Sequence, residues 1–250
     1  MPSQDWPTFL PARIETVLAL PPLAAAAIPD SLASYIDHTL LAPSATPAQV
    51  KALCAEAKAH SFASACINPA HVSLARHELL NTPVRVCAVI GFPLGANSSL
   101  TKAFETRTAV SEGADEVDMV INVGYLKEKL YSKIYEDVVS VVMAAQGRTV
   151  KVIIETHLLT DEEKVAACLI SAEAGAGFVK TSTGFNGGGA TVEDVQLMKK
   201  TVENYKTVKV KASGGVRDGE TARRMVEAGA ERIGTSSGVK IMAGGVGTGY

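Results

Sequence analysis

The stretch Ala174-Gly175-Ala176-Gly177-Phe178-Val179-Lys180-Thr181 ends a helical pattern in a turn of small residues and then enters a β-rich run. The same kind of turn lies at Glu112-Gly113-Ala114-Asp115 and at Ala228-Gly229-Ala230-Glu231. Glycine there provides the left-handed cap with which many helices end. The turns stand 62 and 54 positions apart, and each interval holds two strand-plus-helix units. One unit therefore takes about 30 residues, the usual length of a βα repeat.

Division of residues 34–250 by this unit predicts seven to eight βα repeats. Runs with strand composition lie at 35–39, 64–68, 86–91, 116–123, 150–155, 178–181, 208–212 and 232–234. Helical patterns lie between them at 47–60, 69–80, 101–112, 126–146, 161–174, 192–205 and 219–227. Eight alternations favour an α/β fold in which the sheet closes into a (β/α)8 TIM barrel. A doubly wound open sheet is the alternative, and the absence of G-x-G-x-x-G after the first strand disfavours it.

The first 33 residues differ in composition from the rest, because they are rich in proline and alanine. Their apolar stretch, 18–28, resembles the core of a signal peptide, but Pro21 and Pro22 interrupt it and Arg13 is the only basic residue before it. No later run approaches the ~20 apolar residues that span a bilayer. We therefore predict an N-terminal extension, 1–33, packed on or fraying from a catalytic barrel domain, 34–250.

The bulk composition predicts a soluble globular protein whose partner is a small molecule. Of the 250 residues, 47% are hydrophobic and 20% charged, and the formal net charge is -2 with no long basic run. This balance argues against a nucleic-acid surface or an anionic membrane as partner. The four cysteines show no C-x-x-C spacing, which suits a reducing, cytoplasmic location. The five histidines show no compact ligand spacing, so no bound metal is expected.

Alternation along the strands places charged side chains inside the predicted barrel. In the fourth strand Glu116 and Asp118 share one face, while the alternate residues on the other face are apolar and should meet the helices, namely Val117, Met119, Ile121 and Val123. In the seventh strand Lys209, Lys211 and Ser213 face inward by the same rule, and Lys211 is nearer the carboxyl end, where barrel enzymes carry out their chemistry. We interpret Glu116 as a solvated group or a lower-barrel ion pair, and Asp118 as a candidate general acid or base beside Lys211.

A second lysine, Lys180, ends the sixth strand, next to the strand that carries Lys211. Adjacent strands lie about 4.8 Å apart, so two ammonium groups there would repel each other. One of the two amines is then expected to be neutral and nucleophilic near neutral pH, as imine formation with a carbonyl compound requires. The pair therefore predicts covalent catalysis that needs neither metal nor cofactor.

Glycine-rich loops follow the sixth, seventh and eighth strands. Glycines let the main chain approach an anion, serines add hydroxyl donors, and the loops after strands 7 and 8 are the usual phosphate site of such barrels. Tight turns alone would explain any single loop, but three successive loops favour a phosphorylated carbonyl compound as ligand. The candidate phosphate contacts are Gly184, Ser213, Gly214, Gly215, Gly234, Ser236 and Ser237.

Six motifs follow one another between residues 35 and 237 and are together far more specific than any one alone. They are 36–41 (IDHTLL), 88–95 (AVIGFPLG), 113–118 (GADEVD), 151–156 (KVIIET), 179–185 (VKTSTGF) and 211–217 (KASGGVR). With them the chain resembles the 2-deoxyribose-5-phosphate aldolases, a family of metal-independent class I aldolases. The resemblance implies reversible cleavage of 2-deoxy-D-ribose 5-phosphate to acetaldehyde and D-glyceraldehyde 3-phosphate, a lyase reaction of deoxyribonucleotide catabolism, without a cofactor.

The resemblance also assigns roles to single residues. It implies that Lys180 forms the Schiff base and that Lys211 and Asp118 belong to the proton relay. It also maps six of the residues above onto phosphate contacts, namely Gly184, Gly214, Gly215, Gly234, Ser236 and Ser237. It places Asp37 near the relay and Cys66 near the substrate, with a buried structural cysteine as the alternative for Cys66. A homo-oligomer, dimer or tetramer, is expected.

Two features lie outside the shared motifs or depart from them. Phe185 stands where some relatives carry a phosphate-binding lysine, so less cationic help is expected at that loop. The tail 242–250 contains four glycines and, when extended, could carry Tyr250 to the barrel mouth. We hypothesise that Tyr250 takes part in proton delivery there, with a frayed chain end as the alternative.

Two rival functions remain open from the sequence. A transaldolase-like transferase would also use a Schiff base in a barrel, and a ketose-phosphate donor would distinguish it. A catalytically silent sugar-phosphate-binding barrel would need only the phosphate loops. The presence of both lysines and Asp118 speaks against silence.

Overall fold

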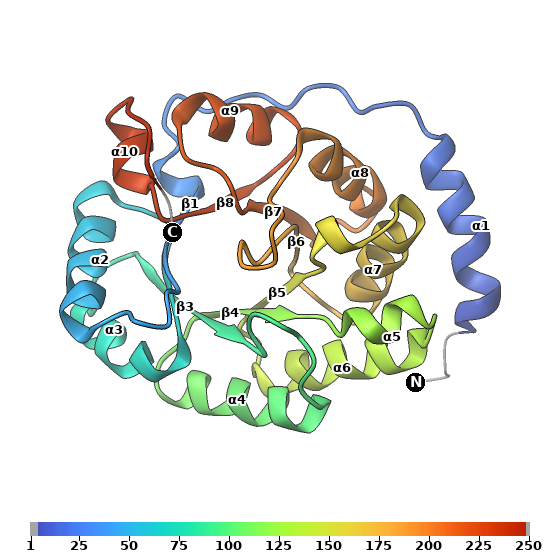
Figure 1. Ribbon diagram of the computed structural model, residues 1–250, viewed down its shortest axis with the longest axis horizontal. Helices are drawn as coiled ribbons and strands as arrows, with labels where there is room; N and C mark the ends of the chain where they lie inside the picture. Colours follow the sequence, from blue (N-terminus) through green and yellow to red (C-terminus); the bar gives the residue numbers. More distant parts are fainter. Residues whose placement is uncertain (1–4, 249–250) are drawn as a thin grey trace.

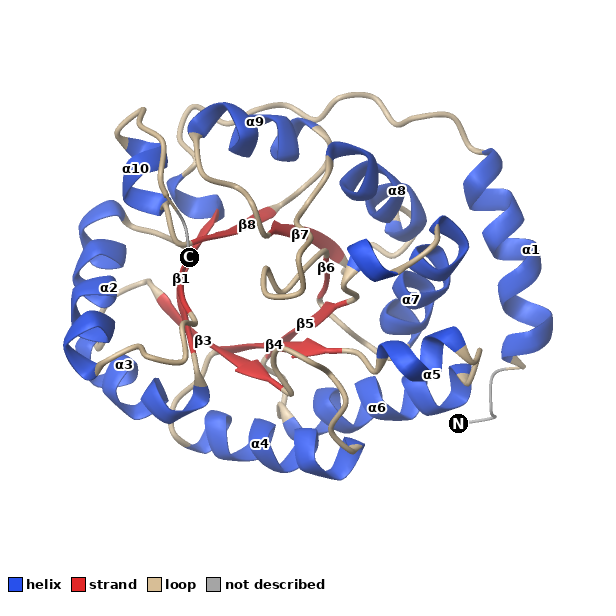
Figure 2. Cartoon of the chain, viewed as in Figure 1, coloured by secondary structure: helices blue, strands red, loops and turns tan. Residues whose placement is uncertain are grey.

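The computed structural model describes residues 5–248, and its centre is a closed barrel of eight parallel strands (Figures 1 and 2). Each strand pairs with its neighbours in the sequence, and β8 closes the barrel on β1. This confirms the predicted TIM barrel and excludes the open doubly wound sheet. The strands are β1 (Ile36–Leu40), β2 (Ser64–Ile67), β3 (Arg85–Ile90), β4 (Glu116–Val120), β5 (Thr149–Ile153), β6 (Phe178–Lys180), β7 (Lys209–Ser213) and β8 (Arg232–Thr235).

The helices form an outer ring around the barrel, as Figure 2 shows. They are α2 (Pro47–His60), α3 (Val72–Glu78), α4 (Ser99–Ser111), α5 (Val123–Lys127), α6 (Tyr131–Ala144), α7 (Asp161–Glu173), α8 (Val192–Val202), α9 (Gly219–Glu227) and α10 (Gly238–Met242). The helices at 47–60 and 219–227 have the predicted bounds. The predicted helix 126–146 is instead two helices, because Lys129 adopts a left-handed conformation (φ 56°) between α5 and α6. Likewise, the segment 69–80 begins with a 3-10 turn (Pro69–His71) before α3.

Side-chain caps fix where several of these helices begin. At α2, the Thr46 hydroxyl accepts a hydrogen bond from the Gln49 N–H, and the Gln49 side chain accepts one from the Thr46 N–H. Thr160 and Glu163 form the same reciprocal capping box at α7. Such boxes satisfy backbone donors that a helix start otherwise leaves without partners.

The alternation expected in β4 is present. Val117 and Met119 pack in the hydrophobic layer between the strands and the helices, whereas Glu116 and Asp118 point into the barrel. In β7, Lys211 is fully buried and lies beside Lys180 in the register between β6 and β7. Lys209 differs from the expectation, because it begins the strand at the lower rim, where its side chain is half exposed and 3.5 Å from Glu231.

The N-terminal segment contains a helix that the sequence patterns missed, α1 (Trp6–Ala19). It lies outside α7 in Figure 1, and the chain then runs along the outside of α8 and α9 to reach β1. Trp6 and Leu10 are buried, and the Trp6 ring contacts Tyr135 of α6. The extension is therefore packed on the barrel, and its division from the catalytic domain at residue 33 stays a prediction. Among residues 5–248, no helix has the length and apolar character to cross a membrane.

Candidate active site

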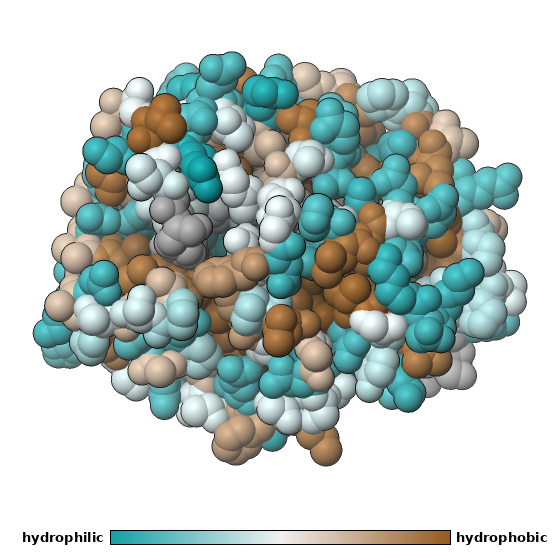
Figure 3. Space-filling view, viewed as in Figure 1, coloured by the Kyte–Doolittle hydropathy of each residue, from teal (hydrophilic) through white to brown (hydrophobic). Residues whose placement is uncertain are grey.

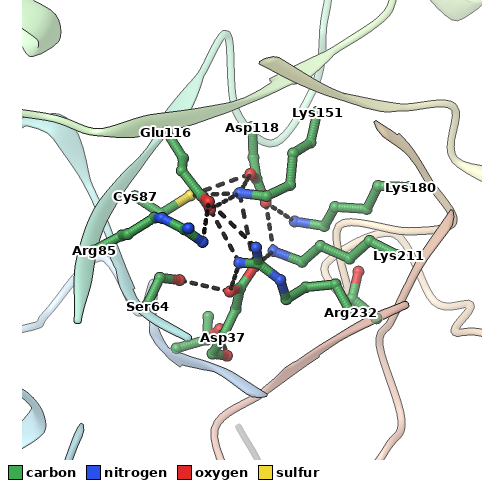
Figure 4. Close-up of polar contacts among 12 residues, drawn as sticks. Asp37, Ser64, Arg85, Cys87, Glu116, Asp118, Lys151, Lys180, Lys211 and Arg232 are labelled. Atoms are coloured by element: carbon green, nitrogen blue, oxygen red, sulfur yellow. Dashed lines mark hydrogen bonds and ion pairs between the residues drawn. The ribbon is translucent and has the colours of Figure 1, made fainter. Parts of the chain in front are cut away.

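Charged side chains from six strands converge inside the barrel (Figure 4). The basic ones are Lys151, Lys180, Lys211 and Arg232, and the acidic ones are Asp37, Glu116 and Asp118. All seven are buried, so each needs a partner of opposite charge. They lie in two layers, with Asp118 in the upper one and Glu116 in the lower one.

Asp118 is the centre of the upper layer. Its Oδ2 atom accepts hydrogen bonds from Lys180 Nζ and Lys211 Nζ, both at 2.7 Å. Its Oδ1 atom accepts from Lys151 Nζ at 2.8 Å and from the Cys87 thiol at 3.1 Å. Burial alone would raise the pKa of Asp118, but the three lysines outweigh it and hold that pKa well below its usual range. Asp118 is therefore an anion that connects two lysines of the predicted site.

Lys211 is held between two carboxylates. Its Nζ atom donates to Asp118 and, at 2.5 Å, to Asp37 Oδ2. Burial lowers the pKa of Lys211, but the charges of Asp118 and Asp37 outweigh burial, so the pKa lies above the ordinary lysine value. Lys211 is thus a cation at neutral pH, and Asp37 lies beside the predicted relay, as the family resemblance implied.

Asp37 joins the upper layer to the lower one. Besides Lys211 it accepts hydrogen bonds from the Ser64 hydroxyl and from Arg232, both at 2.6 Å. Burial acts to raise the pKa of Asp37, but Lys211, Lys151 and Arg232 outweigh it, and the pKa is strongly lowered. The carboxylate therefore stays ionised and fixes Lys211 from below.

Glu116 forms the lower-barrel ion pair that was one of its two sequence interpretations. It contacts Arg232 at 3.1 Å and Lys151 at 2.6 Å, and Arg85 reaches it from the rim at 3.3 Å. Lys151 and Arg232 were not chosen from the sequence. Alternation in β5 would have found Lys151, because Val150 and Val152 face the helices and leave Lys151 inward.

Arg232→Met is expected to lower the free energy of unfolding by about 3 kcal/mol, because it removes a buried cation from Asp37 and Glu116. Urea denaturation measures the change. Lys209→Met is the matched control: this half-exposed lysine pairs with Glu231 at the rim, and its loss should cost less than about 1 kcal/mol. Equal effects of the two substitutions would contradict the importance of the buried pair.

A cavity of about 360 Å³ opens above the upper layer, with Lys180 on its wall. Six of the seven predicted phosphate contacts line it, namely Gly184, Ser213, Gly214, Gly215, Gly234 and Ser236. Ser237 does not line it; this serine faces a neighbouring cavity, and its N–H donates to the Thr235 hydroxyl. Arg217 also lines the cavity and was missed, although it ends one of the quoted motifs. Arg217 therefore places a positive charge on the cavity wall, which Phe185 cannot do.

Glycine is required where the cavity loops meet. A Cβ atom on Gly189 would lie 2.5 Å from the Gly214 carbonyl oxygen, and one on Gly234 would lie 2.8 Å from Ser213 Cβ. The loops after β6, β7 and β8 can therefore close around one cavity only with bare backbone at these points.

The cysteine prediction and the tail prediction have different outcomes. Cys66 is fully buried beside Cys87 and does not line the cavity. With Asp118 these cysteines form a group whose possible ligand atoms lie within 4.8 Å of one another. Three lysines already surround Asp118, so this position repels a metal cation. Tyr250 lies outside the described residues.

Residues 31–244 match the sequence profile of the DeoC/LacD family aldolases. The chain belongs to this family. Deoxyribose-phosphate aldolase of Clostridium tetani is 60% identical over 210 residues, or 83% of this chain and 96% of that protein. The same enzyme of Bdellovibrio bacteriovorus is 55% identical over 214 residues, with 86% and 96% covered. The crystal structure of a protein from Coccidioides immitis matches the fold of this chain with a TM-score of 0.92. The two sequences are 44% identical, and the match covers 95% of both chains. This chain, whose barrel holds the buried lysines, is therefore an aldolase, and aldolases are lyases.

Proposed function

We propose that this aldolase cleaves 2-deoxy-D-ribose 5-phosphate to acetaldehyde and D-glyceraldehyde 3-phosphate through a Schiff base on Lys180. The observation that carries the proposal is the position of Lys180. Its amine is on the wall of a glycine-lined cavity and shares one carboxylate, Asp118, with the protonated amine of Lys211. The relatives that are at least 55% identical over most of the chain bear the name of this activity.

The charges around Lys180 and its place on the cavity wall support it as the nucleophile. Inside the barrel four basic groups face three carboxylates, so one base can be neutral without leaving a carboxylate unpaired. Lys151 and Lys211 both have pKa values above the ordinary lysine range, because nearby carboxylates, Asp118 first, outweigh their burial. Lys180 has Asp118 as its ion-pair partner and also faces the cavity, so it is the base that can react.

Bond cleavage follows from the imine. Lys180 attacks the aldehyde carbon C1, loss of water gives a protonated imine, and this cation accepts the electron pair when the C2–C3 bond breaks. The Asp118 carboxylate takes up the proton of the C3 hydroxyl, directly or through water, as glyceraldehyde 3-phosphate leaves, and Lys211, which donates a hydrogen bond to Asp118, relays the proton. The enamine is then protonated and hydrolysed to acetaldehyde. The same steps in reverse add acetaldehyde to an aldehyde acceptor.

The phosphate group of the substrate is assigned to the loops after β6, β7 and β8. Their glycines leave backbone donors open to the cavity, and Arg217 adds a positive charge on the same wall. The loops after β7 and β8 are the usual phosphate site of TIM barrels.

Sodium borohydride with acetaldehyde is expected to inactivate the enzyme and to leave a reduced two-carbon unit on Lys180, because reduction fixes an imine. Peptide mass mapping locates the label. Exclusive labelling of Lys211 or Lys151 would reverse the assignment of the nucleophile. Borohydride alone, without the aldehyde, is the control and should leave turnover unchanged.

A cleavage assay separates the rival functions. Acetaldehyde release from 2-deoxyribose 5-phosphate should persist with a chelator present, since no step uses a metal. A transaldolase-like enzyme would instead transfer a dihydroxyacetone unit from a ketose phosphate. A silent sugar-phosphate-binding barrel would bind the sugar phosphate and release nothing.

We also propose a homo-oligomer, dimer or tetramer, in the cytoplasm, with small phosphorylated sugars and aldehydes rather than nucleic acid or membrane as partners. A related deoxyribose phosphate aldolase from Aeropyrum pernix, 35% identical with a TM-score of 0.80 over 92% of this chain and 95% of that one, is described as tetrameric. On α4, Leu100 and Phe104 are 82% and 65% exposed, and Figure 3 shows apolar side chains projecting at that edge. Light scattering measures the assembly.

A further inference from the structure

Glu155 lies just beyond β5, on the side of the barrel where Lys180 ends β6. Its backbone is left-handed (φ 57°, ψ 64°), a conformation that residues other than glycine rarely adopt. The residue is only 1% exposed, so a strained backbone here carries a buried carboxylate. Such strain persists only where surrounding contacts hold it, and it is common beside active sites.

The loop after β6 supplies those contacts. Thr183 donates its N–H to Glu155 Oε1 at 3.1 Å and its hydroxyl to Oε2 at 2.6 Å. The side-chain amide of Asn186 donates to Oε2 at 2.8 Å. The Thr183 hydroxyl oxygen in turn accepts the Phe185 N–H at 3.1 Å. One carboxylate thus fixes the turn 183–186, in which Gly184 has a φ of 83°.

The far end of the same loop is fixed by close packing. A Cβ atom on Gly188 would lie 2.2 Å from His157 Cβ, and the Ala190 N–H donates to the Gly214 carbonyl at 3.0 Å. The segment 183–190 is therefore held at one end by Glu155 and at the other by Gly214. Between these anchors it forms one wall of the cavity above Lys180.

We propose that Glu155 is a positioning residue for the phosphate end of the substrate. Glu155 does not line the cavity itself, so it acts through Thr183 and Gly184, which do. Its three hydrogen bonds set where the wall after β6 stands relative to the loops after β7 and β8. The inference rests on the proposed function, because it assigns that wall to the phosphate rather than to the reacting carbonyl group.

Glu155→Gln is the sharpest test, because it keeps the length of the side chain. All three partners of the carboxylate are donors, and an amide offers one acceptor oxygen and one NH₂ group. Whichever way the amide turns, its NH₂ faces a donor, and the turn 183–186 loses at least one anchor. Asn186→Ala removes one of the three bonds and leaves the barrel untouched.

We expect E155Q to raise KM for 2-deoxyribose 5-phosphate and the dissociation constant of inorganic phosphate at least about tenfold each. The kcat, and the KM for unphosphorylated 2-deoxyribose, should change less than about threefold. N186A should shift the same two constants in the same direction, by about threefold. The matched control is E163Q, which changes a carboxylate of the α7 cap to an amide away from the cavity and should change none of them.

Equal rises of KM for the two sugars, or a loss of kcat at unchanged KM, would overturn the assignment of Glu155 to the phosphate. Calorimetric titration with inorganic phosphate needs no turnover. It therefore tests Glu155 even if the wild-type protein cleaves neither sugar, the outcome that would refute the proposed function. An unchanged dissociation constant of phosphate in both E155Q and N186A would also overturn the inference.

Discussion

Lys180→Met is expected to lower the turnover of 2-deoxyribose 5-phosphate by at least about a thousandfold, because among residues 5–248 no other primary amine lines the cavity to form the imine. The fold should survive. Without Lys180, Asp118 still accepts hydrogen bonds from Lys151 and Lys211, so no buried carboxylate is left without a cation. Steady-state cleavage and thermal unfolding are the two measurements.

Lys209→Met is the matched control for this prediction. Lys209 is also a strand lysine, two residues before Lys211, but it is half exposed at the lower rim and pairs with Glu231. Its replacement should leave turnover unchanged. Labelling by acetaldehyde and borohydride should disappear in the Lys180 variant alone, and residual turnover above about one tenth of wild type would refute the Schiff-base assignment.

The sequence alone predicts the parts of the fold that depend on local pattern. Spacing of the glycine turns gives the βα unit and hence the barrel, and alternation correctly orients Asp118 and Lys211. The same rule does not predict that Lys209 is half exposed, because alternation says which face a residue takes but not how high in the barrel it lies. A residue at the first position of a strand reaches solvent even when it points inward.

Cross-barrel partners are harder to predict. Asp37 and Arg232 are 195 positions apart and meet only because β8 closes on β1. No periodicity in either strand carries that information. The left-handed backbones of Lys129 and Glu155 are likewise invisible to patterns of hydrophobicity, because contacts with other segments stabilise them. The helix break and the carboxylate of Glu155 were therefore both missed.

Lys211→Met is expected to lower turnover at least about a hundredfold with an intact fold. The substitution leaves Asp37 bonded to Arg232 and Ser64, and Asp118 bonded to Lys151 and Lys180, so both buried carboxylates keep partners. Urea denaturation should accordingly show a folded protein. What is lost is the cation that shares Asp118 with the nucleophile.

Lys211 can act in two ways, and the pH dependence of the variant separates them. If its positive charge only favours the reactive, unprotonated form of the nucleophile, the defect of the variant should shrink as the pH rises, because hydroxide then removes the proton that the charge disfavours. If it also carries the proton of the C3 hydroxyl, the defect should persist at every pH. Lys211 touches both Asp118 and Asp37, a chain of groups along which a proton can move, so we expect persistence. Full recovery at high pH would reduce Lys211 to an electrostatic role, and near-wild-type turnover at neutral pH would refute both roles.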